Sequence, residues 1–579
     1  IIRFHRMISA SEALFFQLQI SYNITNKEVY HMMVDLPDGA LIYKHGSTFY
    51  VYINTEKVYL KDKGYNENKR MCIGKRSEDD KRKMIPNKNY NKLFADQYLP
   101  EAPERSDTLQ AGLYVVLSKA MHEMSLDTLL DSAYGEDSFL MQDIVQYMIG
   151  CESNAMQYFP DYAYESVIHS ERIHDDNEIC EMFKKQSSQQ HDYFLKNWNA
   201  LHTDARGVYI SYDSTNMNTC ARGVELAEYG AAKDDPDIPD VNFSLAYDQD
   251  NGTPYFYELY HGSIIDNTQC QFMVERAQQY GYHDVGFILD RGYFSSGNIK
   301  FFDKHHYDFI IMAKGNARFI QEAVDGVSER LRLTPFEDYL DEHEVYGKTI
   351  RGCLYPGDQK TRYIHIYYDE KKAAAEREAF LSRLHKMDEE LDKRLEKKLT
   401  RKQDIKSYEK YYSLKFDDNG YFMAHKRKKQ TVQKAMSRLG FFVLITSEKM
   451  SASEALDKYR HRDSIEKLFR TDKSYLGGKA FRVYTDISLE SKTMETFIAI
   501  ILRNDMFNRL KSLYQKDRKN FTVPEAIHQL NKLTITRNPD GRYYQKYAVT
   551  KRQKEILSVY GISEQSYARE IKKICQRIR

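Results

Sequence analysis

The segment from 206 to 313 constrains the fold more than any other part of the chain. Three strand-like runs come first, and a helix, a strand, a second helix and a further strand follow them. Helices that alternate with strands pack on the faces of a sheet, so this order predicts a mixed α/β sheet flanked by helices. The runs span 207–213, 242–247, 255–260, 269–280, 284–290, 296–305 and 309–313.

The rest of the chain divides around this segment. A length of 579 residues predicts about three to five domains. The strongest strand signal before the segment is at 47–60, a long charged helix is expected at 370–410, and a hydrophobic strand at 441–446 is followed by helices at 453–475 and 492–514. The expected parts are a strand-rich basic region at 1–120, a helical region at 121–205, the first part of the sheet domain at 206–340, an α+β insertion domain at 341–440, the second part of the sheet domain at 441–510, and a basic helical region at 511–579.

Composition excludes some classes of protein. Hydrophobic residues make up 42% and charged residues 29%, which is enough apolar material for a large core and excludes a disordered tail. Lys and Arg number 85 against 84 Asp and Glu, which excludes a wholly basic chromatin-type protein. Seven scattered cysteines form no CxxC pair, which favours reduced thiols in a cytosolic protein. No apolar run reaches the roughly 18 residues of a membrane helix.

Two basic stretches interrupt this neutral average. Residues 503–579 carry 18 Lys and Arg against 7 Asp and Glu, and residues 57–88 carry 11 against 5. Such stretches are typical either of solvated surface or of a surface that contacts a polyanion. For 61–88, a solvated loop and a phosphate-contacting surface are both open.

Three acids stand out by their positions in the expected elements. Asp213 and Asp290 each end an apolar strand, and Glu466 lies in the helix after the strand 441–446. Carboxyl ends of neighbouring strands meet at one edge of a sheet, where α/β folds place their sites. A single such acid is more often a turn or cap residue, so the interpretation depends on the set.

The helix of Glu466 carries further polar groups at regular steps. Tyr459, Arg462, Glu466 and Lys473 lie within about 60° of one another on one helical face. The alternative is a charged surface helix with one Arg–Glu pair, worth about 0.3–0.5 kcal/mol.

These motifs together resemble a known family. The pattern Tyr459, two residues, Arg462, three residues, Glu466, six residues, Lys473 resembles the signature of the insertion-sequence-four family of bacterial DDE transposases. YDST around Asp213 and LDRGYFS around Asp290 resemble its two aspartate motifs. The resemblance covers about 206–510 and implies a ribonuclease-H-like core, interrupted before the glutamate, that catalyses DNA transposition.

The resemblance implies a metal site. Three carboxylates that converge repel one another, since two unit charges at 4 Å cost about 4 kcal/mol at an effective dielectric near 20. Carboxylate oxygens select Mg²⁺ or Mn²⁺, and two such ions about 3.5–4 Å apart suit in-line phosphoryl displacement. Asp213 is expected to bridge both ions, with Asp290 and Glu466 each holding one.

The resemblance also implies DNA as the partner. Arg462 and Lys473 are expected to hold the phosphate backbone, and Tyr459 to hydrogen-bond a phosphate near the cut. The expected substrates are double-stranded terminal inverted repeats and target DNA, bound by a homodimer in the bacterial cytoplasm at the nucleoid, without a membrane. Some relatives stack a flipped base on a tryptophan, but Trp198 is the only tryptophan and is expected in the core. Tyr293, Phe294 or a tyrosine of the insertion remain open as substitutes.

Three other functions compete with this one. A metal-dependent nuclease on the same fold would cut DNA without joining it. An inactive DNA-binding relative is expected to have a broken acid triad, whereas all three acids are present here. A carbohydrate hydrolase needs only two carboxyls and gives no reason for the basic helix face.

Overall fold

The computed structural model forms two compact units, Ile1–Arg105 and Ser106–Arg579, which are described separately. It describes residues 33–60, 65–77, 80–94, 105–202, 208–230, 235–315, 317–333, 336–355, 357–397, 400–478, 480–539 and 541–578.

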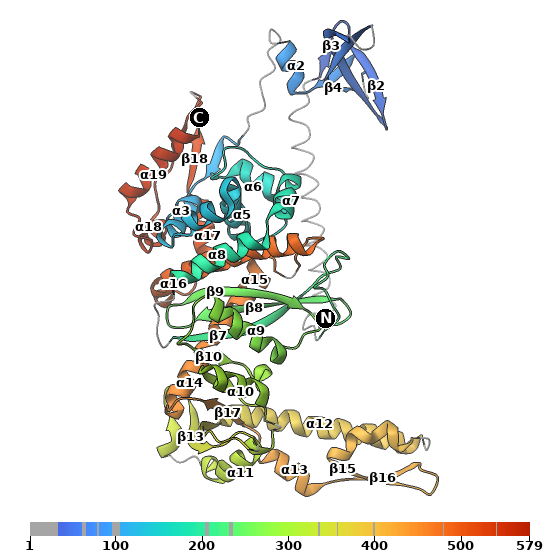
Figure 1. Ribbon diagram of the computed structural model, residues 1–579, viewed down its shortest axis with the longest axis vertical. Coiled ribbons are helices and arrows are strands. Elements are labelled where there is room, and N and C mark those ends of the chain that lie inside the picture. The colour runs from blue at the N-terminus through green and yellow to red at the C-terminus, as the bar shows by residue number, and fades with distance from the viewer. Residues whose placement is uncertain are drawn as a thin grey trace. The chain divides into compact units, whose positions relative to one another are not determined.

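The described residues of the first unit form an antiparallel sheet with one helix (Figure 1). Its strand order is β1-β5-β4-β3-β2, and Val51, Ile73 and Met84 form a small core with Tyr90 of the helix. The strand predicted at 47–60 is confirmed as β3, whereas much of 61–88, for which a loop was one expectation, is strand. The elements are β1 (Val34–Asp35), β2 (Leu41–His45), β3 (Thr48–Leu60), β4 (Tyr65–Arg76), β5 (Lys83–Pro86) and α2 (Lys88–Leu93).

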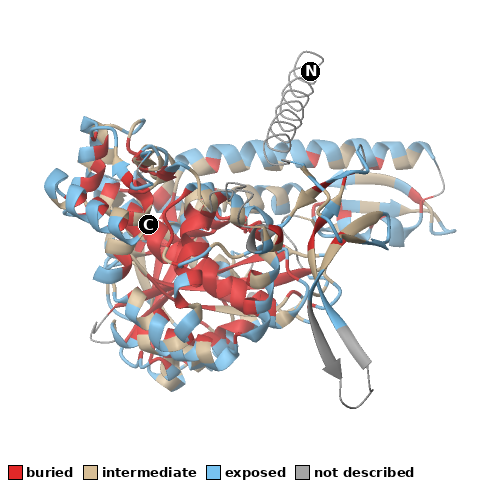
Figure 2. Ribbon diagram, turned by 90° about the horizontal axis from the view of Figure 1, so that it is seen from above, coloured by how far each residue is buried: buried red, intermediate tan, exposed pale blue. Residues whose placement is uncertain are grey.

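The second unit begins with a layer of helices around one long buried helix, α16 (Asp486–Lys516). Figure 2 shows buried residues concentrated in these central elements. Trp198, in α8, is 1% exposed and donates from Nε1 to the Pro254 carbonyl at 3.0 Å, which confirms it as a core residue. The other helices are α3 (Gly112–Glu123), α4 (Leu126–Tyr134), α5 (Ser138–Cys151), α6 (Phe159–Glu165), α7 (Asp176–Lys185) and α8 (Ser188–Ala200).

A nine-stranded mixed sheet lies beside this layer, in the order β12-β13-β14-β17-β11-β10-β7-β8-β9. Strands β7, β8 and β9 run antiparallel to one another, β10 and β11 run parallel to β7, and β17, β14, β13 and β12 continue antiparallel. The mixed α/β prediction is therefore confirmed. The strands are β7 (Tyr209–Asn218), β8 (Asp240–Asp248), β9 (Thr253–His261), β10 (Gly286–Leu289), β11 (Asp308–Met312), β12 (Tyr339–Leu340), β13 (Val345–Gly352), β14 (Arg362–Tyr368) and β17 (Phe441–Thr446).

Helices connect the strands of this sheet. The helices expected at 269–280 and 296–305 are present, and α11 is an additional helix before β12. They are α9 (Asp266–Gln279), α10 (Ser296–His305) and α11 (Arg318–Arg332).

An excursion from the sheet separates β14 from β17. It packs around its own core, which includes Leu384, Leu391 and Tyr412. The helix predicted at 370–410 ends at Glu396, because Ile405 and Tyr408 fold back onto that core in a short 3₁₀ helix. Strands β13 and β14, which fall in the range 341–440 expected for an insertion, pair in the main sheet next to β12. The excursion holds α12 (Glu370–Glu396), η5 (Lys402–Lys410), β15 (Tyr412–Phe416), β16 (Phe422–Arg427) and α13 (Lys429–Met436).

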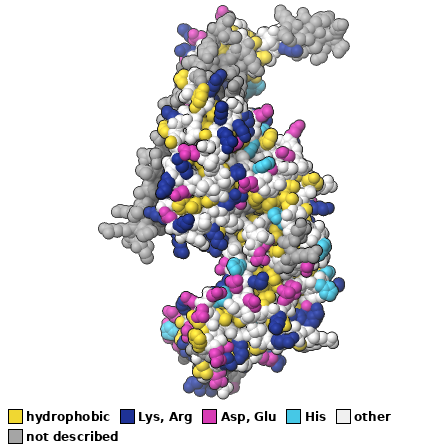
Figure 3. All heavy atoms as spheres, turned by 90° about the vertical axis from the view of Figure 1, so that its left-hand side faces the viewer, with side chains coloured by type: hydrophobic (Ala, Val, Ile, Leu, Met, Phe, Trp, Pro, Cys, Tyr) yellow, Lys and Arg dark blue, Asp and Glu magenta, His cyan; other side chains and the backbone are white. Residues whose placement is uncertain are grey.

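The last part of the chain returns to the start of the second unit, since β18 pairs with β6 (Thr108–Gln110). In the face drawn in Figure 3, Lys and Arg are interspersed with Asp and Glu. Among the helices that the structure describes, none has the length and apolarity to cross a bilayer. The elements here are α17 (Val523–Asn531), β18 (Thr534–Arg537), β19 (Tyr543–Gln545), α18 (Lys551–Ser558) and α19 (Glu564–Arg577).

Candidate active site

Two of the three predicted acids lie side by side in the sheet. Strands β7 and β10 are parallel neighbours, and their register pairs Tyr212 with Leu289. Asp213 is the next residue of β7, and Asp290 directly follows the end of β10, so this register sets them alongside each other where the two strands lie about 4.8 Å apart. Asp213 does not end its strand as predicted, because β8 pairs with β7 as far as Asn218. It lies where the parallel partner β10 stops.

The backbone orients one oxygen of each aspartate. Asp290 Oδ1 accepts a hydrogen bond from the Arg291 N–H at 2.6 Å and caps the short helix η3 (Arg291–Tyr293). Asp213 Oδ1 accepts from the Ser214 N–H at 2.9 Å.

The helix predicted at 453–475 reaches these acids in two pieces. α14 (Ala452–His461) starts with a capping box formed by Ser451 and Glu454, and α15 (Asp463–Tyr475) follows after a break at Arg462. The prediction of one continuous helix is therefore wrong at one residue.

Gln249 explains the break. Its amide, oriented to satisfy its neighbours, donates to the Lys458 carbonyl and accepts from the Arg462 N–H, both at 2.9 Å. A side chain that inserts into the helical hydrogen-bond ladder interrupts the helix. Gln249 also accepts a hydrogen bond from the Ser211 hydroxyl on β7 and so ties the break to the strand that carries Asp213. Sequence reasoning missed Gln249, since a polar residue after a strand gives no signal of a contact some 200 positions away.

Arg462 joins two of the acids directly. Its Nη1 donates to Asp213 Oδ2 at 2.8 Å, and its Nη2 donates to Glu466 Oε1 at 2.7 Å. The Arg462 and Asp213 side chains are 9% and 15% exposed, whereas Glu466 is 55% exposed. The guanidinium therefore bridges a buried and an open carboxylate.

Tyr459 connects the remaining acid to this group. Its hydroxyl donates to Asp290 Oδ1 at 3.5 Å, and its ring centroid lies 5.5 Å from Arg462 Cζ. The structure thus brings five of the six predicted site residues together. Lys473 lies seven residues beyond Glu466 on the same helix, about 10 Å farther along its axis.

The electrostatics of the cluster follow from these contacts. Burial lowers the pKa of Arg462, but Tyr459 and the three carboxylates outweigh burial and raise that pKa above its usual value. Burial, with Asp290 and Asp213 nearby, raises the pKa of Tyr459, while Arg462 opposes the rise. Near neutral pH the cluster therefore contains a guanidinium cation and a neutral phenol that can donate.

The donor chemistry of the cluster fits Mg²⁺ or Mn²⁺, since all three acids supply hard carboxylate oxygens. The arrangement fits only in part, because Arg462 already bonds both Asp213 and Glu466. Within the described residues, no three His, Cys, Asp or Glu side chains are grouped closely enough to hold an ion. Glu466 would therefore have to move closer to the aspartates to join them around a metal.

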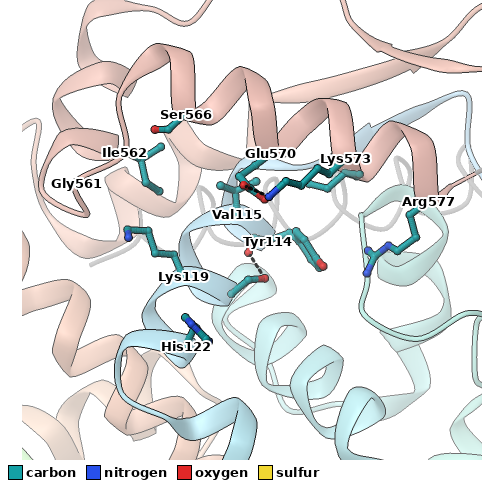
Figure 4. A pocket seen from close by; sticks show the side chains of 12 residues that line it. Tyr114, Val115, Lys119, His122, Gly561, Ile562, Ser566, Glu570, Lys573 and Arg577 are labelled. Atoms are coloured by element: carbon teal, nitrogen blue, oxygen red, sulfur yellow. Dashed lines mark hydrogen bonds and ion pairs between the residues drawn. The ribbon is translucent and has the colours of Figure 1, made fainter.

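A cavity of about 470 Å³ lies elsewhere, between α3 and α19 (Figure 4). Charged groups on its wall have partners: Lys573 pairs with Glu570 at 2.8 Å, and His122 pairs with Asp127 at 2.9 Å. None of the acids described above lines it. The sheet edge is therefore the better candidate for chemistry.

Two residues considered for base stacking are buried. Tyr293 is 0% exposed, and Phe294 is 9% exposed with its ring 6.0 Å from that of Phe319. Neither presents an open ring face in this structure.

Comparisons with known proteins place this site in a family. No curated protein matches the chain. A cryo-EM structure of a piggyBac transposase synaptic complex with hairpin DNA aligns at 10% sequence identity, over 68% of this chain and 61% of that one, with a TM-score of 0.31. The family model described as the transposase DDE domain matches residues 206–502, which is more than half of the 579 residues and includes Asp213, Asp290 and Glu466. The chain therefore belongs to the transposase DDE domain family.

Proposed function

We propose that the chain is the transposase of a bacterial insertion sequence, which binds terminal inverted repeats and catalyses metal-dependent DNA strand cleavage and strand transfer. One observation carries the proposal: Asp213 and Asp290 lie alongside each other, and Tyr459, Arg462 and Glu466 close over them from a distant part of the chain. The spacing of those last three residues also supports assignment to the insertion-sequence-four family.

The topology supports a ribonuclease-H-like core. Three antiparallel strands are followed by two parallel strands that helices connect, in the order β9-β8-β7-β10-β11. This arrangement sets the two aspartates on adjacent central strands, at the edge where a ligand can approach.

Asp213, Asp290 and Glu466 would hold two Mg²⁺ or Mn²⁺ ions. When bound, such ions supply an activated water or 3′-hydroxyl and stabilise the leaving oxygen. The protein's own part is to fix the aspartates through β7 and β10, and to deliver the glutamate from α15. Arg462 pairs with two of these acids in this structure and offsets their charge.

Arg462, Lys473 and Tyr459 would contact DNA. The Arg462 guanidinium has the planar fork of donors that a bidentate contact with a phosphate would use. Tyr459 keeps its proton near neutral pH, so its hydroxyl can donate to a second phosphate oxygen. Lys473 lies farther along α15 and would extend the contact along the backbone.

The partners we propose are double-stranded inverted repeats, target DNA and a second copy of the chain. Basic charge supports the first two, because 503–579 carries 18 Lys and Arg against 7 Asp and Glu. A homodimer would pair the two transposon ends. The proposed setting is the bacterial cytoplasm, at the nucleoid.

The test is strand transfer with pre-cut transposon ends. Asp213→Asn should abolish cleavage and joining while DNA binding persists, and Asp284→Asn, an exposed acid just before β10, serves as the matched control. Cleavage without joining would favour the nuclease. Wild-type activity of Asp213→Asn would remove Asp213 from the site.

A further inference from the structure

The first unit presents a sheet face on which aromatic and cationic side chains are adjacent. The register pairs Tyr43 with Tyr50 and Tyr50 with Lys75, so these three residues form a row across β2, β3 and β4. The pairing of Asn54 with Arg70 places Arg70 on the same face, since residues two apart on a strand share a face. Tyr52 lies between the two pairs on β3. We call the surface made by Tyr43, Tyr50, Tyr52, Arg70 and Lys75 the tyrosine face.

Part of the opposite face of the sheet packs against α2. Val51 is fully buried, as are Ile73 and Met84, and α2 contributes Tyr90 to the same core. The sheet is therefore packed on one side only. On the tyrosine face Tyr43 is 37% exposed, and Arg70 and Lys75 are exposed.

Cations hold the rings of the tyrosine face in place. Arg70 donates to the Tyr43 hydroxyl, and its guanidinium carbon lies 5.2 Å from the centroid of that ring. Lys75 Nζ lies 5.7 Å from the Tyr50 centroid. Tyr43 and Tyr52 meet edge to face at 5.5 Å. Each positive charge thus lies next to an aromatic ring.

We propose that the tyrosine face binds single-stranded DNA. Stacking on tyrosine needs a base whose face is open, which an unpaired strand offers and a duplex does not. Arg70 and Lys75 lie beside the rings, where they can contact the phosphates that link stacked bases. The positive charges of Arg70 and Lys75 favour a polyanion, and the tyrosine rings beside them favour one whose bases are unpaired.

This activity differs from that of the candidate active site. The tyrosine face belongs to a separate compact unit, outside the residues 206–502 that the family model matches. It would hold an unpaired segment of the DNA on which the second unit acts. Only the source of that DNA rests on the proposed function, because binding itself needs neither metal nor cleavage.

The test measures binding of the full-length chain in EDTA to a fluorescent 15-nucleotide oligothymidine. Tyr43→Ala with Tyr50→Ala should weaken binding about tenfold or more, whereas the corresponding phenylalanine pair should stay within about twofold of wild type, since stacking needs the ring and not the hydroxyl. Arg70→Ala with Lys75→Ala should reduce the salt slope by about 1.4, or 0.7 for each lost phosphate contact. Lys44→Ala is the matched control, because Lys44 is exposed next to Tyr43 but lies on the opposite face.

A crosslinking experiment separates this face from DNA binding by the second unit. Oligonucleotides with 5-iodouracil should crosslink to peptides that contain Tyr43 or Tyr50. Crosslinks confined to 106–579 would overturn the proposal. Equal loss of binding in Lys44→Ala would also overturn it. So would a tyrosine-to-alanine pair that loses as much affinity for a 15-base-pair duplex as for oligothymidine. Circular dichroism shows whether the tyrosine-to-alanine pair is still folded. If it is not, the phenylalanine pair, the Arg70/Lys75 variants and the crosslinks still decide the question. If the tyrosine face does not bind single-stranded DNA but the chain still carries out strand transfer, only this inference is wrong and the proposed function is unaffected.

Discussion

Arg462 offers the sharpest test of the site, because it occupies the place between two acids that a divalent cation would need. Arg462→Met keeps the length of the side chain and removes its charge. Asp213 would then lose its 2.8 Å ion pair, and Glu466 its 2.7 Å pair. We expect the variant to be less stable without metal and to regain part of that loss when Mg²⁺ is added.

The size of the effect follows from burial. Removing one partner of a buried ion pair costs about 3–5 kcal/mol, and the pair between Arg462 and Asp213 is 9% and 15% exposed. Glu466 is 55% exposed, so its bond adds only about 0.3–0.5 kcal/mol. We expect a loss of about 3 kcal/mol in EDTA. Mg²⁺ at about 100 times its Kd would return roughly 2.7 kcal/mol.

The assay uses the only tryptophan as the probe. Trp198 is 1% exposed and lies in the same compact unit as the acids, so its fluorescence reports unfolding of that unit in urea. Unfolding is measured in EDTA and in Mg²⁺ for the wild type, for Arg462→Met and for Arg470→Met. Arg470 is an exposed arginine of α15, the helix that follows Arg462, and controls for loss of charge alone.

Three results would refute the reasoning. Equal stability of Arg462→Met and wild type in EDTA would mean that the bridge between the acids contributes nothing. Equal stabilisation of both proteins by Mg²⁺ would mean that arginine and metal do not compete for the same carboxylates. A loss in Arg470→Met as large as in Arg462→Met would reduce the effect to general surface charge.

Other predictions concern groups near the site. Burial raises the pKa of Asp472 from 3.8 to about 7, so the folded state keeps a proton that the unfolded state releases between these values. Its carboxyl therefore destabilises the fold increasingly from about pH 4 to pH 7, and the stability of Asp472→Asn relative to wild type should rise by up to about 4 kcal/mol between urea titrations at pH 4 and pH 8. Gln249→Leu removes the amide that interrupts the helix at Arg462, so single-turnover cleavage should fall about tenfold to a hundredfold while DNA affinity in EDTA stays unchanged. Unchanged cleavage would show that the break does not position Arg462.

Local patterns predicted the elements well where strands and helices follow one another closely. The strand at 441–446 and the helix at 296–305 have the predicted bounds, because apolar runs and caps within each segment determine them. Asp213 and Asp290 also lie close together, as we expected, because β7 and β10 are parallel neighbours in the sheet.

Predictions that needed partners from far along the chain were less accurate. Asp213 was placed at a strand end because the run 207–213 is apolar, and the run alone does not reveal that β8 extends the pairing to Asn218. The break at Arg462 depends on Gln249, which lies more than 200 positions earlier. β13 and β14 were assigned to an insertion because β17, the strand that binds β14 into the sheet, comes about 75 residues later. In each case the missing information is a hydrogen-bond partner and not a local preference.

The direction of β17 explains why the glutamate arrives on a helix. β17 runs antiparallel to β11, so it leads away from the edge that carries Asp213 and Asp290, and it ends beside Phe309 at the start of β11. The chain must therefore travel back along the sheet before it can reach the acids. α14 has ten residues and is about 15 Å long, close to the roughly 13 Å of the four-residue strand β10. One helix thus returns the chain by about one strand length and delivers Arg462 to Asp213. Because β14 and β17 are neighbours in the sheet, the excursion between them can vary in length without moving this helix. Asp290 and Glu466 can therefore share a site although 176 residues separate them in the sequence.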